Sequence, residues 1–332
     1  MEWRRVWQAR QLMKKNEGFL PSWHAYVGFK LHLFDELSQG VQMQTFIETS
    51  AYDATLLRNW VETGLVLGHL KLDRKQTLRP SKHAATYYSH QSPYSIGELL
   101  REMMELHLPT LLHYPHLMQS GQEKLTYRHE DFGKTVAETS AMIEKLAIRE
   151  VMQWMKRYQP NNILDIGCGH AGYLIQLSKK YLTKQFTGID VNPQVVQAAQ
   201  QKIQNQNIQN VRILEQDVSS LPASEATYDQ IMMNNILHYF SPQQRQQLFA
   251  WSREQLQHNG TLTVISPIYD KNQGSAFSAA FNNFMSAHQN LYSLPTQEEI
   301  VQYSQSSGYR VERMTPVVKE GAWYFIGLRK IA

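Results

Sequence analysis

The segment Ile163–Leu174, with the sequence ILDIGCGHAGYL, decides how the rest of the chain is interpreted. Its apolar start predicts a short buried strand over 162–167, and the residues from 170 to 181 predict a helix directly after it. The turn between them contains Gly167, Gly169 and Gly172, and glycine allows close approach of the backbone to a ligand and of a helix to a strand. Read literally, this spacing fits the fingerprint of dinucleotide-binding turns.

The segments that follow repeat the alternation of strand and helix. Helices separated by short strands indicate βαβ units and therefore a parallel sheet. Two further strands near the C-terminus are expected to close the edge of this sheet. We predict strands over 162–167, 185–190, 211–217, 228–237, 260–268, 309–315 and 322–328, and helices over 170–181, 192–206 and 241–257.

Acidic residues follow three successive strands of the predicted sheet. Asp165 ends the first strand, Asp190 the second and Asp217 the third. In an open α/β sheet, ligands bind outside the carboxyl ends of the strands. A dinucleotide would place its pyrophosphate beside Asp165, and like charges close together in a cleft are costly. A ligand with a net positive charge, such as S-adenosylmethionine, suits three carboxylates better. A nicotinamide dinucleotide and a domain without cofactor remain as alternatives.

The run ILDIGCGHAGYL…FTGIDVNP…EQDV…MNNILHYF, over residues 163–240, resembles the class I S-adenosylmethionine-dependent methyltransferases. The resemblance covers about 160–332 and implies a Rossmann-like, seven-stranded, mostly parallel sheet with S-adenosylmethionine as cofactor. By this resemblance, Asp165, Gly167 and Gly169 cradle the amino-acid end of the cofactor. The remaining cofactor residues that it implies are Asp190 at the ribose, Val191 beside the adenine, Asp217 and Val218 at the adenine edge and face, and Asn234 on the methionine side.

His238 is the candidate general base. Its unperturbed pKa suits proton transfer near neutrality, and it follows the fourth strand of the predicted sheet. In O-methyltransferases that this chain resembles, a histidine in the matching motif removes the proton of the acceptor hydroxyl. Two departures from the family pattern leave open that His238 has only a structural role. Tyr239 stands where the plant pattern has aspartate, and residues 292–293 supply no carboxylate to orient the ring.

A helix predicted after the fifth strand is the candidate wall of the acceptor pocket. It carries Phe277, and the substrate-binding residues predicted on it are Phe281, Phe284, Met285 and His288. Ordinary core packing explains the same pattern equally well. Three histidines at 107, 113 and 116 could cover the cleft, but the prolines among them break the spacing that a helical metal site needs, so no metal site is predicted.

The first half of the chain has a different character. Residues 24–37 and 51–70 have apolar residues at helical spacing, with Ser50 expected as the N-cap of the second helix. A helix end and a small hairpin then suggest a winged-helix-like domain. Residues 96–107 predict a helix, 108–118 short or broken helices because of Pro109 and Pro115, and 133–158 a long amphipathic helix.

This first half resembles, more loosely, the dimerisation domain of small-molecule O-methyltransferases of the plant caffeate type and of bacterial antibiotic pathways. That resemblance implies a homodimer whose helical domain covers the substrate cleft. We expect a helical winged-helix-like domain over 1–130, a connecting helix over 131–160 and the cofactor-binding domain over 161–332.

Composition excludes several other classes of protein. The 332 residues are 42% hydrophobic, which is typical of a globular chain, and the single cysteine, Cys168, allows no internal disulfide and no cysteine-based zinc cluster. No run of about 18 apolar residues is present, so neither a membrane span nor a membrane partner is expected, and a cytoplasmic location is the default. The net charge of +4 is spread evenly rather than gathered in a basic stripe, which argues against a nucleic-acid partner.

The sequence therefore predicts a homodimeric, cytoplasmic methyltransferase of secondary metabolism. Its expected partner is a small-molecule acceptor, most simply the hydroxyl of an aromatic or polyketide-like metabolite. The alternatives are methylation of carbon or nitrogen without a histidine base, and a non-catalytic winged-helix regulator that senses the cofactor.

Overall fold

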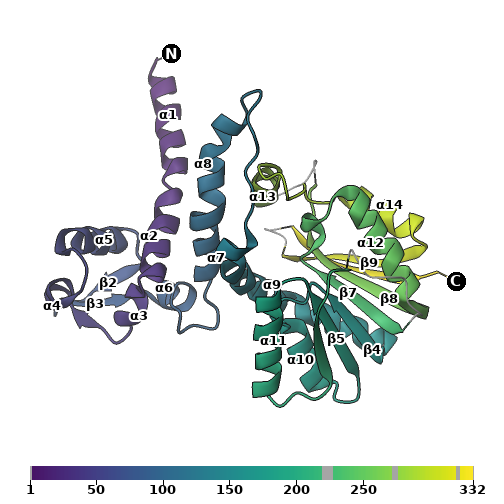
Figure 1. The fold of residues 1–332 in the computed structure, drawn as a ribbon. Coiled ribbons are helices and arrows are strands. Elements are labelled where there is room, and N and C mark those ends of the chain that lie inside the picture. The colour runs from purple at the N-terminus through teal and green to yellow at the C-terminus, as the bar shows by residue number, and fades with distance from the viewer. Residues whose placement is uncertain (1, 219–226, 271–275, 319–321, 332) are drawn as a thin grey trace. The chain divides into compact units, whose positions relative to one another are not determined.

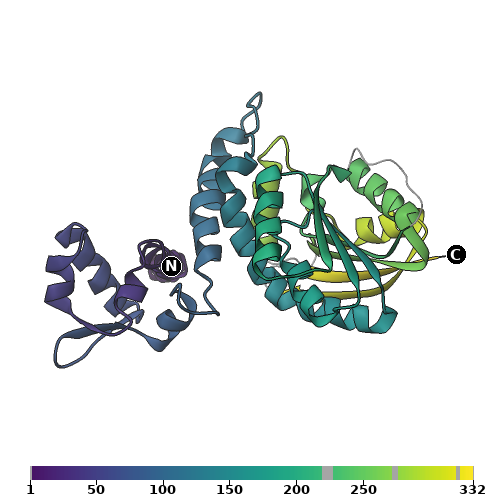
Figure 2. The same ribbon diagram turned by 60° about the horizontal axis from the view of Figure 1, so that its bottom comes forward.

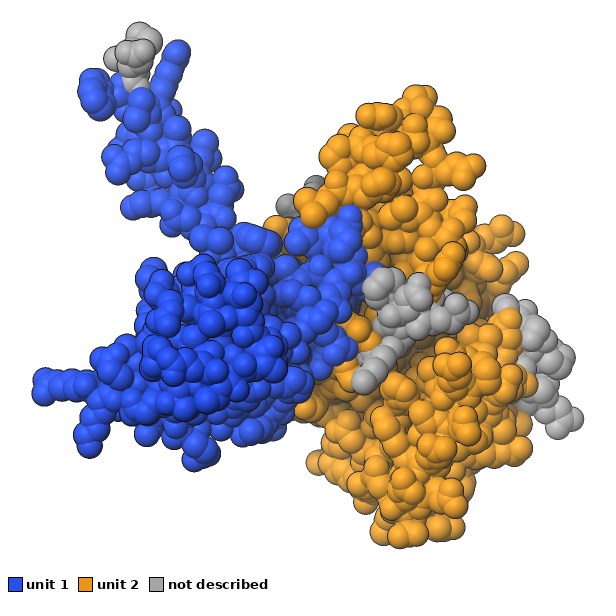
Figure 3. Space-filling view, turned by 60° about the vertical axis from the view of Figure 1, so that its left-hand side comes forward, with its two compact units in different colours: residues 1–109 blue, residues 110–332 orange. Residues whose placement is uncertain are grey.

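The computed structural model describes residues 2–218, 227–270, 276–318 and 322–331. The chain divides into two compact units, Met1–Pro109 and Thr110–Ala332, which Figure 3 colours separately. The break thus lies at residue 109, whereas the sequence suggested a boundary at 130. The physical reason is that the segment before residue 130 is tied to the second unit: the amide of Leu125 donates to the carbonyl of Ala287 at 3.0 Å, and that of Tyr127 to the side chain of Asn290 at 2.8 Å.

A seven-stranded sheet forms the centre of the second unit, with the order β6-β5-β4-β7-β8-β10-β9 (Figures 1 and 2). The five strands from β6 to β8 are parallel, and β10 runs antiparallel between β8 and β9. The strands are β4 Asn162–Ile166, β5 Gln185–Asp190, β6 Val211–Glu215, β7 Tyr228–Asn234, β8 Leu256–Pro267, β9 Tyr309–Val318 and β10 Trp323–Lys330.

Helices cover both faces of this sheet. Helices α9, α10 and α11 pack on one face, and α12 and α14 on the other (Figures 1 and 2). The starts of α11 and α12 fit the sequence, since Asn192 caps α11 and Ser241 forms a capping box with Gln244 at the start of α12. The helices are α8 Leu108–Leu117, α9 His129–Tyr158, α10 Gly172–Lys180, α11 Pro193–Asn205, α12 Pro242–Gln255, α13 Ala276–Ser286 and α14 Gln297–Ser306, with a short helical turn η3 at Leu237–Tyr239.

The core of this unit lies between the sheet and its helices. Strand β4 is buried on both faces from Ile163 to Ile166, which explains its unbroken apolar run apart from the acid at position 165. Burying apolar area stabilises a fold by about 25 cal/mol per Å². This buried central strand is therefore firmly anchored, and it fixes the points from which the adjoining loops start. The carboxyl ends of β4 to β7 therefore form a rigid edge for a binding site.

The first unit is mainly helical and carries a small three-stranded sheet with the order β1-β3-β2. Strands β2 and β3 form the antiparallel hairpin that the sequence suggested after the second helix. The elements are α1 Glu2–Asn16, α2 Phe19–Lys30, α3 Leu33–Glu36, β1 Val41–Gln42, α4 Met43–Thr49, α5 Ala54–Val66, β2 Leu70–Leu72, β3 Thr77–Pro80, α6 Lys82–Tyr87, α7 Gly97–Glu102 and the π-helical turn η1 Met103–His107.

Three details of the helices differ from the sequence prediction. His32 adopts a left-handed conformation (φ 59°) and splits the helix expected over 24–37 into α2 and α3. Asp53, not Ser50, caps α5, because its carboxylate accepts from two amides of the first turn. Helix α8 is continuous through Pro115, where breaks were expected. A π-helical turn, Met103–His107, stands just before Pro109, which lacks the amide proton that a regular α-helix would use there.

None of the described helices is both long and apolar enough to cross a membrane.

Candidate functional site

The glycine-rich turn after β4 forms an open cradle. Gly167 and Gly169 have φ angles of +66° and +54°, a region that side chains rarely adopt. A Cβ on Gly167 would collide with Ile236, whereas the space around Gly169 is open. The turn is thus shaped by backbone requirements at Gly167 and leaves room for a ligand at Gly169.

Asp190, at the end of β5, holds the cradle in place. One of its carboxylate oxygens accepts from the amide of Gly169 at 3.0 Å, and the other accepts from the amide of Asn192 at 3.0 Å. A carboxylate can accept about four hydrogen bonds, so each oxygen keeps a lone pair for a hydroxyl group. The second predicted acid therefore both fixes the glycine turn and has capacity for a ribose.

Asp165 lies beneath this turn and is only 1% exposed. Burial, and then the nearby carboxyl of Glu144, raise the pKa of Asp165 well above its usual value, while a hydrogen bond from Asn234 at 3.0 Å opposes the shift. The side-chain oxygen of Asn234 is buried and has no hydrogen-bond partner within the described part of the chain. Asn234 therefore keeps an acceptor oxygen available, and the residue lines the cavity described next.

A cavity of about 960 Å³ opens where these strand ends meet. Its size is at the upper end of the range for small-molecule pockets. Val191 is 66% exposed at its wall and is therefore accessible to a ligand. The sequence-predicted cofactor residues that line it are Gly167, Gly169, Asp190, Val191, Asp217, Val218 and Asn234, while Asp165 lies next to Asn234 without lining it.

Helix α9 forms a wall of this cavity that sequence reasoning missed. The sequence suggested only a connecting helix, and its amphipathic pattern does not reveal which face meets a ligand. The Ser140 hydroxyl accepts from the side chain of Asn235 at 3.3 Å, and burial raises the pKa of Glu144 to about 7. The α9 residues on the cavity are Val136, Ala137, Glu138, Ser140, Ala141, Ile143 and Glu144.

Electrostatics favour a cation in the cavity over a pyrophosphate. A pyrophosphate would sit at the N-terminus of α10, where the helix dipole attracts anions. The carboxyl of Glu144 already lies there, because a Cβ at Gly172, the first residue of α10, would overlap it. Asp190 adds negative charge close by, and Asp165 adds a buried carboxyl that a cation would stabilise in its ionised form. The cations that line the cavity within the described residues are Lys202 and, when protonated, His170.

These residues fit S-adenosylmethionine. The Asp190 oxygens have free lone pairs for ribose hydroxyls, the orphaned Asn234 oxygen can accept from an ammonium group, and the space beside Gly169 accommodates a closely approaching ligand. Cys168 is also on the cavity wall but is 7% exposed, and burial raises the pKa of its thiol. It serves as a small apolar filler in the turn.

His238 lies in the short turn η3 and is 2% exposed. Its ring contacts the ring of Tyr239 (centroids 4.3 Å apart) and meets Phe281 edge-on at 6.0 Å. Its backbone carbonyl accepts from the amide of Tyr292 at 3.0 Å, so the loop that lacks a carboxylate does reach this histidine. His238 does not line the large cavity itself, whereas its neighbour Tyr239 does.

The predicted acceptor-pocket residues belong to an aromatic cluster beside the cavity. Phe281 stacks on Trp323 at 6.0 Å, and Trp323, which the sequence did not single out, donates its indole N–H to Asn235 at 3.3 Å. Tyr127 and Tyr239 join the cluster to the cavity, since both line it and contact members of the cluster. The predicted substrate-binding residues Phe281, Phe284, Met285 and His288 are all buried, and His288 lies two positions beyond the end of α13.

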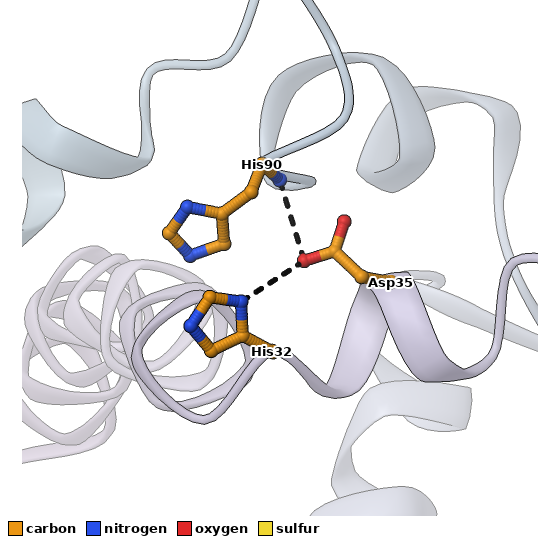
Figure 4. Close-up of side chains that lie close together, drawn as sticks. All are labelled: His32, Asp35 and His90. Carbon is orange, nitrogen blue, oxygen red and sulfur yellow. Dashed lines mark hydrogen bonds and ion pairs between the residues drawn. The ribbon is translucent and has the colours of Figure 1, made fainter.

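One described group in the first unit has the composition of a metal site: His32, Asp35 and His90 (Figure 4). The two imidazole rings are stacked, with centroids 4.1 Å apart and planes 21° from parallel. Ring nitrogens bind metals in the plane of the ring, so these lone pairs run nearly parallel and do not converge. Nε2 of His90 is also bonded to the carbonyl of Phe29 at 2.9 Å. We therefore assign no metal to this group.

The three histidines at 107, 113 and 116, which the sequence suggested as a cover of the cleft, differ in burial and in partners. His107 is buried and pairs with Glu102 at 3.1 Å, because the π-helical turn η1 brings residues five apart together. His113 and His116 are exposed, with their rings 4.9 Å apart. The three do not form one ligand set.

Comparison with known proteins supports this view of the site. Residues 163–260 match the family model described as a methyltransferase domain. A release factor glutamine methyltransferase of Fusobacterium nucleatum is 30% identical over 91 residues, and the chain covers only 25% of that protein.

Two solved structures resemble the chain over nearly its full length. An O-methyltransferase family protein from Burkholderia thailandensis and human N-acetylserotonin methyltransferase in complex with S-adenosylmethionine each have a TM-score of 0.81 and 17% identity, with 98% of both chains covered. At this identity the likeness concerns the fold, and it confirms the predicted combination of a seven-stranded, mostly parallel sheet with a mainly helical N-terminal part.

Proposed function

We propose that this chain, which carries a class I S-adenosylmethionine-dependent methyltransferase domain, transfers a methyl group to a hydroxyl of a small aromatic or polyketide-like molecule. The domain and the cofactor predicted from the sequence agree with the family match at residues 163–260. The acceptor and the residue roles below are proposals.

The observation that carries the proposal is the junction of two chemically different surfaces. The cavity is lined by carboxylates suited to a cationic donor, and a cluster of aromatic rings adjoins it through Tyr127 and Tyr239. Aromatic side chains bind flat, apolar molecules through offset-stacked and edge-to-face contacts. A planar acceptor bound against Phe281 and Trp323 would therefore lie next to the donor.

When bound, S-adenosylmethionine supplies a methyl group on a sulfonium, a leaving group that is already activated. The protein then has to align the acceptor oxygen and exclude water, which is worth up to roughly 7–11 kcal/mol. We assign Asp190 to the ribose, Asp217 and Val218 to the adenine, and Asp165 with Asn234 to the methionine end. The buried aromatic cluster keeps water from the acceptor side.

His238 is proposed as the base that takes the proton of the acceptor hydroxyl. A general base contributes typically about 10²–10⁴-fold. The imidazole touches Phe281 and Tyr239, the two rings through which an acceptor would be held beside the cavity. A departing proton thus has a nearby nitrogen to accept it.

Methylation of carbon or nitrogen without a base is the second candidate. Two observations favour it: His238 does not line the cavity, and the Tyr292 segment that reaches it brings no carboxylate. An amine or an enol-like carbon would need no histidine.

We further propose that the chain acts in the cytoplasm as a homodimer through a winged-helix-like first unit. Helix α1 presents Trp3, Val6, Trp7 and Met13, each at least 50% exposed, along one side. Exposed apolar patches of this kind mark interaction surfaces. A second copy of the chain is the proposed occupant, and light scattering would show a mass near twice 38.6 kDa.

Transfer of radiolabelled methyl from S-adenosylmethionine to a panel of phenols and aromatic amines tests the function. In this assay, His238→Ala should slow methylation of an ordinary phenol by about 10²-fold or more, and should slow that of an acidic nitrophenol much less. Tyr239→Phe, which keeps the neighbouring ring, is the matched control. Equal rates for wild type and His238→Ala on every phenol would show that His238 is not the base. No transfer to any acceptor would count against the function itself.

A further inference from the structure

Glu144 occupies an unusual position for a carboxyl group. It projects from the long helix α9 onto the first residue of α10, where a Cβ at Gly172 would overlap both of its oxygens. Ala171, the N-cap of α10, makes no side-chain capping bond. The acid thus lies at an uncapped helix N-terminus, on the wall of the large cavity.

The groups around Glu144 supply little positive charge to stabilise its ionised form. Asp165 from β4 is a neighbouring carboxyl, Tyr173 from α10 is an uncharged neighbour, and Asp190 from β5 acts on Asp165 in turn. Lys202 from α11 is the cation that acts on it, and its effect is smaller than that of burial. Glu144 and Asp165 therefore lie close enough to interact, with Lys202 as the cation that acts on Glu144.

We propose that Glu144 is a further ligand of the methyl donor, accepting a hydrogen bond from the α-ammonium of its methionine moiety. This inference rests on the proposed use of S-adenosylmethionine. The geometry points to the ammonium because Glu144 adjoins Asp165 and Asn234, the end of the cavity assigned to the amino acid.

The proton and the ammonium are alternative ways to neutralise the same pair. Without ligand, burial holds the pKa of Glu144 at about 7 and that of Asp165 well above its usual range. An ammonium between the two carboxyls favours their ionised forms. The proton leaves the Glu144 carboxyl for a buffer base, and affinity should rise with pH below about 7 and level off above it.

Calorimetry with S-adenosylhomocysteine, which has the same amino acid, measures this proton directly. At pH 6, titrations in buffers of different ionisation enthalpy should show a contribution from Glu144 of about 0.9 proton released per ligand bound, falling to about 0.1 at pH 8, as expected for a group with a pKa of about 7, in addition to any proton that Asp165 releases. Glu144→Gln should abolish most of this release and weaken binding at least about tenfold.

Two controls isolate the effect. Glu150→Gln is the same change on the same helix, at a residue paired with Arg313 and outside the cavity, and it should behave as wild type. Methylthioadenosine, which has no amino acid, should bind Glu144→Gln and wild type equally, which also shows that the variant is folded.

The outcomes separate this inference from the proposed function. If Glu144→Gln keeps both the affinity for S-adenosylhomocysteine and the proton release of wild type, Glu144 is not a ligand and the inference is wrong while the function stands. If wild type binds neither S-adenosylhomocysteine nor methylthioadenosine, the proposed function itself fails.

Discussion

Glu144 should also make the ligand-free protein less stable as the pH rises. Its pKa is raised from 4.5 to about 7 in the folded chain, so between these values the folded state binds more protons than the unfolded state. The stabilising contribution is complete below the unfolded pKa and is lost as the pH rises through the folded one. At about 1.4 kcal/mol per pKa unit, the shift corresponds to roughly 3 kcal/mol, of which about 2–3 kcal/mol falls between pH 5 and 8.5.

The change Glu144→Gln removes this titration while keeping the shape of the side chain. Urea unfolding of the ligand-free protein at pH 5 and pH 8.5 should therefore show a drop in the free energy of unfolding that is about 2–3 kcal/mol smaller in the variant than in wild type. Asp165 titrates in the same direction and leaves a residual drop. Glu150→Gln should show the wild-type drop. Equal drops in wild type and Glu144→Gln would refute the reasoning, because the carboxyl would then not be buried as described.

Three further changes have defined outcomes. Asp190→Ala removes the acceptor of the Gly169 amide and the proposed ribose ligand, so affinity for S-adenosylhomocysteine should fall about 10²-fold or more by calorimetry, and retained micromolar affinity would contradict the assignment. Gly172→Ala should cost no more than about 1 kcal/mol in thermal unfolding, because the atoms that it overlaps are the end of the flexible Glu144 side chain, and truncating Glu144 to alanine as well should restore the loss; strict additivity would disprove the contact. Asp53→Ala should destabilise the first unit by about 1 kcal/mol through loss of the α5 cap, with donor affinity unchanged, and a stability equal to wild type would exclude the capping role.

Much of the second unit could be predicted because its signals are local. The alternation of buried strands and capped helices defines the βαβ units, and the glycines and acids at the ends of β4, β5 and β6 follow from that register alone. Seven predicted cofactor residues accordingly meet at one cavity.

The contribution of α9 could not be predicted because it depends on long-range packing. Nothing in the pattern of 133–158 indicates that Glu144 meets Gly172 rather than solvent. Trp323 was missed for the same reason, since its contact with Phe281 joins a C-terminal strand to a helix more than thirty residues earlier. The continuity of α8 through Pro115 shows local propensity overridden by its surroundings.

The lone sulfhydryl of the chain gives experimenters an advantage. Cys168 is buried at the floor of the cavity with its ionisation suppressed, so maleimide dyes should react with it slowly. Cysteines introduced on the outer surfaces of the two units could then be labelled selectively without replacing the native residue. Fluorescence energy transfer between such dyes would report, in solution, how the spacing of the units responds when donor and acceptor molecules are added.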